Sequence, residues 1–153
     1  MHQRIYQSAL KELGLELDFW RIAMRPGKPL IYGKLGSTHF IGLPGNPVSA
    51  LVCALIFLRP AILAFLGATK SDLPFLEVPI LSSLDENDER EDYLRATFER
   101  NSSGQLAVSP YKLQDSSMIS LITTADVLIV RPPYDKKVKA GEMLRVIPLS
   151  HQI

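Results

Sequence analysis

The segment from Gly42 to Ala50, with the sequence GLPGNPVSA, contains residue types that could bind an anion. Pro44 and Pro47 each fix the backbone φ angle, and Gly45 between them can adopt angles that other residues avoid. The pair of Asn46 and Pro47 is typical of the N-cap and first position of a helix. Because a helix N-terminus offers N–H groups and a partial positive charge, an oxyanion could bind there. The alternative is a rigid turn between two core elements.

Basic residues ahead of this turn form a second candidate anion site. No acidic residue lies between Asp18 and Asp72 to neutralise them. Guanidinium and ammonium groups at such spacing could hold a phosphate or another oxyanion, although spacing alone favours a solvated basic face. The four that fall within 14 residues are Arg21, Arg25, Lys28 and Lys34.

The second half of the chain offers two further candidates. Arg95 falls in the middle of an expected strand, on the face opposite the apolar one, and its alternative is an exposed arginine on an outer face. Ser116 stands at the possible start of a short helix over 115–124, and its alternative is simple N-capping. The six acidic residues from Asp85 to Asp92 are expected to form a solvated loop.

The period of the apolar positions predicts the elements that position these residues in the first half. Two prolines and a glycine exclude a strand ladder in the loop, and Gly36 with Ser37 forms a turn. The expected elements are a helix over 3–13, a strand over 15–24, a loop over 25–29 and short strands over 30–33 and 38–42.

The apolar run from Val48 to Leu66 has 19 residues, and a membrane span needs about 20. Arg59 and Pro60 lie past its midpoint and would place a charge and a broken hydrogen bond in lipid. We therefore expect a buried helix that is kinked or restarts at Pro60. Since about 70 residues provide little cover for a helix that is apolar on all sides, either another chain covers it or the segment belongs to a larger fold that begins upstream.

The character of the chain changes after a polar, proline-ended linker over 67–74, which is a plausible domain boundary. The helices and strands expected before this linker predict an α/β segment at 1–70. The short alternating strands expected after it predict a β-rich unit at 75–153. The continuous apolar run over 127–130 is typical of a strand covered on both faces. The other expected strands lie over 76–80, 93–100, 106–108 and 144–149.

Composition excludes several classes of function. The chain of 153 residues is 46% hydrophobic with net charge +1, so no global feature indicates a nucleic-acid or membrane partner. Aromatic residues do not interleave with the basic ones as stacking on nucleic acid would require. The single cysteine, Cys53, excludes an intrachain disulfide, fits a reducing compartment such as the cytoplasm, and is expected to be a buried, inert thiol. The chain contains none of the motifs typical of serine hydrolases, zinc proteases or P-loop nucleoside triphosphatases.

Several motifs, in this order, resemble the MoeA family of molybdopterin molybdenumtransferases, which is related to the E domain of gephyrin. The likeness covers nearly the whole chain. The motifs are MRPGKP at 24–29, GKL at 33–35, GLPGNPVSA at 42–50, YLR at 93–95, QDSSMI at 114–119, AD at 125–126 and AGE at 140–142.

The resemblance implies an activity and a set of partners. The family inserts molybdate into the dithiolene of molybdopterin, using an adenylylated pterin whose AMP is released in a Mg²⁺-dependent step. Its members are homodimers whose cleft lies between the α/β domain of one subunit and the C-terminal domain of the other. Residues 1–70 would then be the C-terminal part of an incomplete three-layer molybdopterin-binding domain, and 75–153 a small β-barrel-like domain.

The resemblance also implies substrate-binding residues, while no catalytic residue can be assigned. The GLPGNPVSA turn would shape the floor of the cleft, and the basic residues would hold phosphate or molybdate. The residues carried over by position are Arg21, Arg25, Lys28, Pro44, Gly45, Asn46, Pro47, Ser49, Arg95 and Ser116.

Two departures from the family pattern affect this expectation. The family has Gln-Gly-Ser-Gly or a close variant where this chain has Gln114, Asp115, Ser116 and Ser117, so a negative charge stands beside a supposed oxyanion site. The family's nucleotide- and metal-binding motifs lie upstream of Met1, so the isolated chain is expected to be incomplete for catalysis and to carry no metal ligands. The alternative function is a non-catalytic molybdopterin-binding or dimerisation module from a truncated gene product.

Overall fold

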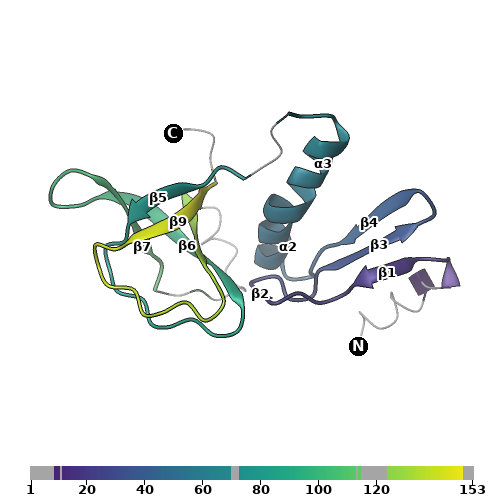
Figure 1. The fold of residues 1–153 in the computed structure, drawn as a ribbon, viewed down its shortest axis with the longest axis horizontal. Coiled ribbons are helices and arrows are strands. Elements are labelled where there is room, and N and C mark those ends of the chain that lie inside the picture. The colour runs from purple at the N-terminus through teal and green to yellow at the C-terminus, as the bar shows by residue number, and fades with distance from the viewer. Residues whose placement is uncertain (1–8, 11, 70–72, 113, 115–123, 150–153) are drawn as a thin grey trace.

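The computed structural model describes residues 9–10, 12–69, 73–112, 114 and 124–149 (Figure 1). The first half contains an antiparallel sheet in the order β1 (Glu16–Phe19), β3 (Ile31–Leu35) and β4 (Thr38–Gly42). β3 and β4 form the predicted hairpin, whose turn contains Gly36 with a φ of 58°. The predicted helix over 3–13 falls mostly outside the described residues.

The predicted strand over 15–24 is wrong, because this stretch supplies two strands to two different sheets. β1 ends at Phe19 after an irregularity in its pairing with β3. The chain then leaves this sheet, and β2 (Met24–Arg25) pairs in parallel with β6 (Glu91–Arg100), a strand of the second half. The partner that decides this pairing is 67 positions away from β2, so local periodicity could not reveal it.

The apolar run forms one continuous helical stretch with a local change of geometry. α2 (Pro47–Cys53) is followed by the π-helical turn η1 (Ala54–Leu58) and by α3 (Arg59–Phe65). The predicted restart at Pro60 is confirmed, because the wider π turn ends at Leu58 and α3 begins at Arg59. Pro60, which cannot donate an intrahelical hydrogen bond, thus lies in the first turn of α3.

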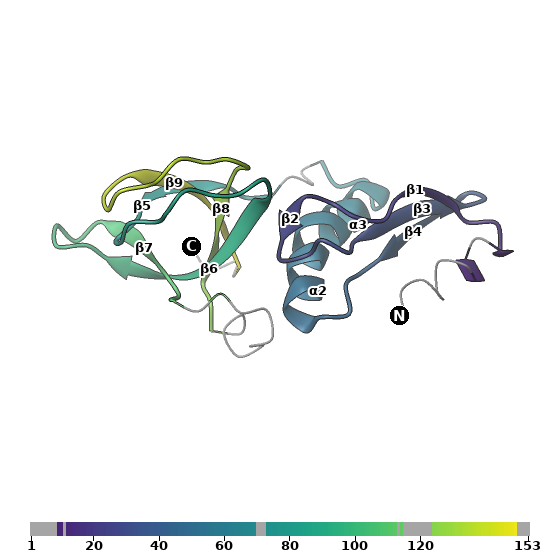
Figure 2. The same cartoon turned by 90° about the horizontal axis from the view of Figure 1, so that it is seen from below.

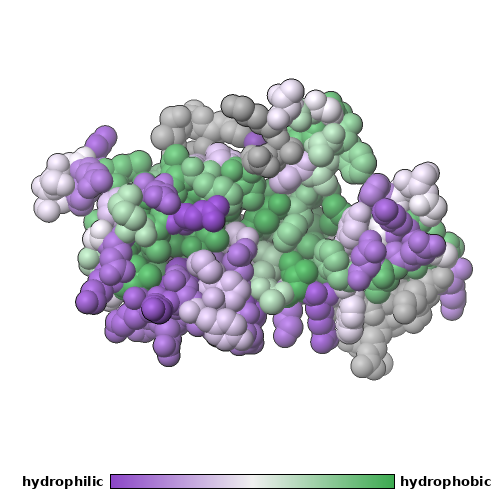
Figure 3. Space-filling view, viewed as in Figure 1, coloured by the Kyte–Doolittle hydropathy of each residue, from purple (hydrophilic) through white to green (hydrophobic). Residues whose placement is uncertain are grey.

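The prediction that this helix is buried is wrong. Only 22% of the most apolar 18-residue stretch of this helix is buried, and the residues Leu51 and Phe65 are 49% and 69% exposed. The inner face of α2 packs on the core while α3 turns apolar side chains outward, which Figure 3 shows as a green surface. The helical stretch Pro47–Phe65 is long and apolar enough to cross a membrane. Core helices of globular proteins meet the same criteria of length and composition.

The second half curls towards a barrel without a continuous ladder to close it (Figure 2). Its remaining strands are β5 (Leu76–Pro79), β7 (Leu106–Pro110), β8 (Val127–Arg131) and β9 (Met143–Pro148). The strand order is β2-β6-β8-β9-β5, and β7 also pairs with β6. A single bridge from Ile80 to Val108 brings the end of β5 to β7.

β8 explains how the two halves are joined, and it confirms the prediction of a strand covered on both faces. Val127 and Ile129 belong to the core inside the curled sheet. Leu128 and Val130 belong to a second core, which they share with residues of β2 and α2. This shared core contains Met24, Leu30, Val52, Cys53, Tyr93, Leu128, Val130 and Ile147.

Candidate functional site

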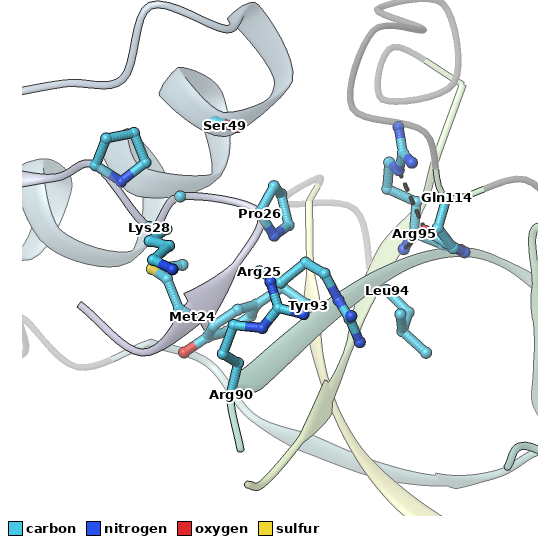
Figure 4. A pocket seen from close by; sticks show the side chains of 12 residues that line it. Met24, Arg25, Pro26, Lys28, Ser49, Arg90, Tyr93, Leu94, Arg95 and Gln114 are labelled. Carbon is cyan, nitrogen blue, oxygen red and sulfur yellow. Dashed lines mark hydrogen bonds between the residues drawn. The ribbon is translucent and has the colours of Figure 1, made fainter. Parts of the chain in front are cut away.

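A cavity of about 420 Å³ opens between the two halves of the chain (Figure 4). One wall comes from the loop after β2 and from α2, and the other comes from β6 and the segment after β7. The lining residues are Met24, Arg25, Pro26, Gly27, Lys28, Pro29, Ser49, Arg90, Tyr93, Leu94, Arg95 and Gln114.

The loop over 26–29 keeps its shape through backbone hydrogen bonds and close packing on the helix. Ile22 N donates to Lys28 O at 3.0 Å, and Leu30 N donates to Gly27 O at 3.1 Å. Gly27 has a φ of 126°, and a Cβ at this position would lie 2.6 Å from the sulfur of Cys53. Only glycine therefore allows the loop to approach the helix this closely.

Cys53 itself is buried, as predicted. Its Sγ lies 3.8 Å from Gly27 O, and burial raises the pKa of the thiol to about 11. The thiol is therefore protonated at neutral pH and is not a nucleophile.

The charge of the lining is positive. Arg25, Lys28, Arg90 and Arg95 all contribute to it, and among the described residues no aspartate or glutamate does. Figure 4 shows Lys28 and Arg95 at opposite ends of the cavity, with Arg25 and Arg90 between them. This spread suits an extended ligand with more than one anionic group better than a single small anion.

Arg25 is held by acidic residues of the second half. Its guanidinium donates to Asp88 at 3.0 Å and also to Asp92, whose side chain is only 5% exposed. The other carboxylate oxygen of Asp92 is buried with no hydrogen-bond partner among the described residues. The expectation of a merely solvated acidic loop over 85–92 is therefore wrong, because the fold brings Arg25 against this run.

Asp88 also binds Arg90 at 2.6 Å. The hydrogen bonds from Arg90, together with the nearby charge of Arg25, lower the pKa of Asp88 to about 2. Asp88 is thus ionised at neutral pH and binds two of the cavity's cations at once.

Arg95 is 2% exposed, so its alternative as an exposed outer arginine is wrong. The side chain of Gln114 binds it in two places: Oε1 accepts from the backbone N–H of Arg95 at 3.0 Å and from its Nε at 3.3 Å. Gln114 Nε2 donates to Arg95 O at 3.0 Å (Figure 4). β7 ends at Pro110, and Tyr111 N still donates to Arg95 O at 3.0 Å, so Gln114 supplies the acceptor that the Arg95 N–H would otherwise lack.

Comparison with known protein families matches both halves of the chain. The profile described as "MoeA C-terminal region (domain IV)" matches residues 77–149, and the profile described as "Probable molybdopterin binding domain" matches residues 3–64. The chain belongs to the MoeA family.

Curated relatives and solved structures agree with this assignment. A molybdopterin molybdenumtransferase of Haemophilus influenzae is 33% identical over 95% of this chain and 36% of its own length. The molybdenum cofactor synthesis protein cinnamon of Drosophila melanogaster is 36% identical over 90% of this chain and 23% of its own. The chain thus spans about a third or less of these relatives. A crystal structure of a MoeA protein from Pyrococcus horikoshii, at 24% identity, has the same fold over 94% of this chain and 34% of that one, with a TM-score of 0.76.

In this MoeA chain, the cavity brings together four of the residues expected to bind substrate: Arg25, Lys28, Ser49 and Arg95. Arg21 lies outside the lining and stacks on the ring of Trp20 at 4.3 Å. Ser116 is outside the described residues.

The turn of the GLPGNPVSA motif contributes less to the lining than expected, because Pro44, Gly45, Asn46 and Pro47 all lie outside it. The predicted N-cap is confirmed, since Asn46 Oδ1 accepts from Ser49 N at 3.2 Å. That N–H is therefore already satisfied by the protein.

Sequence reasoning missed Arg90, Tyr93 and Gln114. Arg90 lies inside the acidic stretch from Asp85 to Asp92, and Tyr93 and Gln114 occur only within family motifs, so none of the three stands out by residue type and spacing. No described group of three or more His, Cys, Asp or Glu could hold a metal ion. The described residues thus provide no ligand set for the Mg²⁺ that the resemblance implies.

Proposed function

We propose that this chain acts in molybdenum cofactor biosynthesis, as part of a molybdopterin molybdenumtransferase that inserts molybdate into adenylylated molybdopterin. The cavity between its halves is the substrate-binding part. The observation that carries this proposal is the meeting of Arg25, Lys28, Arg90 and Arg95 from both halves around one cavity whose described lining contains no acidic residue. The names of the relatives in Haemophilus and Drosophila support it.

The size and charge of the cavity fit such a substrate. About 420 Å³ lies within the usual range of small-molecule pockets. An adenylylated pterin carries phosphate charge along an extended molecule, which cations at the two ends of the cavity can bind together. A guanidinium binds phosphate in a planar, bidentate way, whereas the ammonium of Lys28 acts as a point charge.

The proposed roles of these residues are binding and orientation. Lys28 and Arg95 contact anionic groups at the two ends, and Ser49 borders the cavity from the helix. Arg25 and Arg90, fixed by Asp88 and Asp92, form a preorganised surface between those ends. Such fixed groups orient a bound substrate without reorganising when it arrives.

The proposal extends to the organisation of the protein. Residues 1–70 form the end of the molybdopterin-binding domain and 75–153 the C-terminal domain. The protein is a cytoplasmic homodimer, and Mg²⁺ and the nucleotide are bound mainly by residues outside those described here. The exposed apolar side chains of α3 favour self-association. They also sustain the alternative of a non-catalytic dimerisation module.

Binding titrations on the purified chain test the proposal, with molybdate, AMP and molybdopterin as probes. Lys28→Ala and Arg95→Ala should each weaken binding of molybdopterin by about tenfold, which is the effect of losing roughly 1.4 kcal/mol. Lys137→Ala is the matched control, because Lys137 is 65% exposed and pairs only with the surface residue Asp85 at 3.4 Å.

Two results would contradict this proposal. Binding that is indifferent to both cavity substitutions would exclude the cavity as the site. A chain that forms a stable dimer in light scattering but binds none of the three probes would favour the non-catalytic module.

A further inference from the structure

Gln114 lies in the cavity wall at a gap along the edge of β6. β2 pairs with this edge only at Glu91 and Asp92, and β7 pairs with it only from Ala96 onwards. Between these two partners, Arg95 O accepts from Tyr111 N at 3.0 Å, directly after β7, whereas the N–H of Arg95 needs a partner from outside the strands. The cavity opens at this gap, where Tyr93, Leu94 and Arg95 line it.

The carboxamide of Gln114 fills part of the gap with four hydrogen bonds. Oε1 accepts from Arg95 N at 3.0 Å and from Arg95 Nε at 3.3 Å. Nε2 donates to Arg95 O at 3.0 Å and to Tyr111 O at 2.9 Å. The side chain of Gln114 thus binds the backbone N–H, the backbone C=O and the guanidinium of Arg95.

The contact to Nε links the gap to the binding surface. Because the guanidinium is planar, a hydrogen bond at Nε fixes the plane in which its terminal nitrogens lie. The terminal nitrogens are the part of arginine that binds an oxyanion in a bidentate way.

We propose that Gln114 is a positioning residue, which sets the Arg95 guanidinium for a phosphate-type oxyanion of the substrate. This inference rests on the proposed function. Gln114 acts through Arg95 and needs no contact with the reacting atoms.

The chemistry of the site explains why glutamine suits this position. A methionine of similar length makes none of the four hydrogen bonds. A glutamate could accept from Arg95 N and Nε, but it could not donate to the carbonyls of Arg95 and Tyr111, and it would place a negative charge beside the oxyanion. Gln114→Glu should therefore impair anion binding more than Gln114→Met, although it keeps a contact to Arg95.

A double-mutant cycle tests this role, with molybdopterin as the probe and the thermal midpoint of each variant measured in parallel. Gln114→Met should weaken binding about five- to tenfold and Gln114→Glu more. Adding Arg95→Ala to Gln114→Met should cause almost no further loss, whereas adding Lys28→Ala should lower affinity by its full separate factor. Gln105→Met is the control, because Gln105 is exposed in the turn between β6 and β7.

The outcomes separate this inference from the proposed function. If Lys28→Ala and Arg95→Ala both leave molybdopterin binding unchanged, the proposed function fails. If those two weaken binding but Gln114→Met binds as tightly as the wild type, or if its effect multiplies with that of Arg95→Ala, the positioning role is overturned and the proposed function stands. Should Gln114→Met not fold, the rank order of wild type and Gln114→Glu decides, and equal affinities of these two would overturn the role.

Discussion

Arg25 donates a hydrogen bond from its guanidinium to the carboxylate of Asp92, and the same two residues face each other in the parallel pairing of β2 with β6. Backbone and side chains therefore join the two halves of the chain at one point. The side chain of Asp92 is only 5% exposed, whereas the side chain of Arg25 is 46% exposed. Arg25 thus serves both as a wall of the cavity and as a tie between the halves.

Removing the carboxylate at position 92 should destabilise the fold. Asp92→Ala leaves Arg25 with only Asp88 and Asn87 as side-chain partners and opens a small void, and we expect a loss of about 1–3 kcal/mol in the free energy of unfolding, measured by urea titration. The exposure of Arg25 keeps the loss below that of a fully buried pair. Asp85→Asn is the control, because Asp85 is 93% exposed, and it should change stability by less than about 0.5 kcal/mol. Equal stabilities of the two variants would contradict this role of Asp92.

Stability should depend on pH through Asp88. Its pKa is about 2 in the folded protein against 3.8 for the free group, so the unfolded chain binds a proton first as pH falls. The contribution of Asp88 is present above about pH 4 and is lost between about pH 4 and pH 2. In urea titrations across this range, Asp88→Asn should show a shallower acid loss than the wild type. Identical pH profiles would show that the Arg90 contact does not hold in solution.

Gly27 should not tolerate a side chain. Gly27→Ala places a Cβ 2.6 Å from Cys53 Sγ at a φ of 126°, and we expect a loss of about 2–4 kcal/mol in the free energy of unfolding. Gly45→Ala is the matched control, since nothing lies within 4 Å of its Cβ and its φ is not positive, so its stability should stay near that of the wild type. A neutral Gly27→Ala would mean that the loop packs less closely on α2 than described here.

The thiol of Cys53 should be unreactive in the folded protein. The rise in its pKa from 9.0 to about 11 lowers the thiolate fraction at pH 8 about 100-fold, and burial blocks access as well. Titration with a chromogenic disulfide should detect no thiol in native buffer within minutes and one thiol per chain in urea. Rapid labelling of the native protein would show that the core around α2 opens readily.

Features that depend on neighbouring residues were predictable from the sequence. The hairpin of β3 and β4 follows from two short apolar runs around a Gly-Ser turn. The start of α2 follows from an asparagine before a proline. The apolar run of β8 predicted a strand covered on both faces, although the sequence could not reveal that its second cover is α2 and β2 of the other half.

The candidate site was predictable only in part. Arg25, Lys28 and Ser49 lie in motifs whose residue types suggest anion binding, and they do line the cavity. The pairing of Arg25 with acidic partners was not predictable, because Arg25 and Asp92 are 67 residues apart and meet only where β2 pairs with β6.

By itself, the sequence determined the local elements, the resemblance to the MoeA family and the concentration of positive charge in the first half, because these depend on residue types and short spacings. Only the tertiary structure decided that β2 joins the second sheet, that Asp88 and Asp92 bind Arg25, and that the side chain of Gln114 binds the backbone of Arg95. These relationships depend on which backbone edges remain unpaired after folding. A chain meets that requirement with partners from any distance in the sequence.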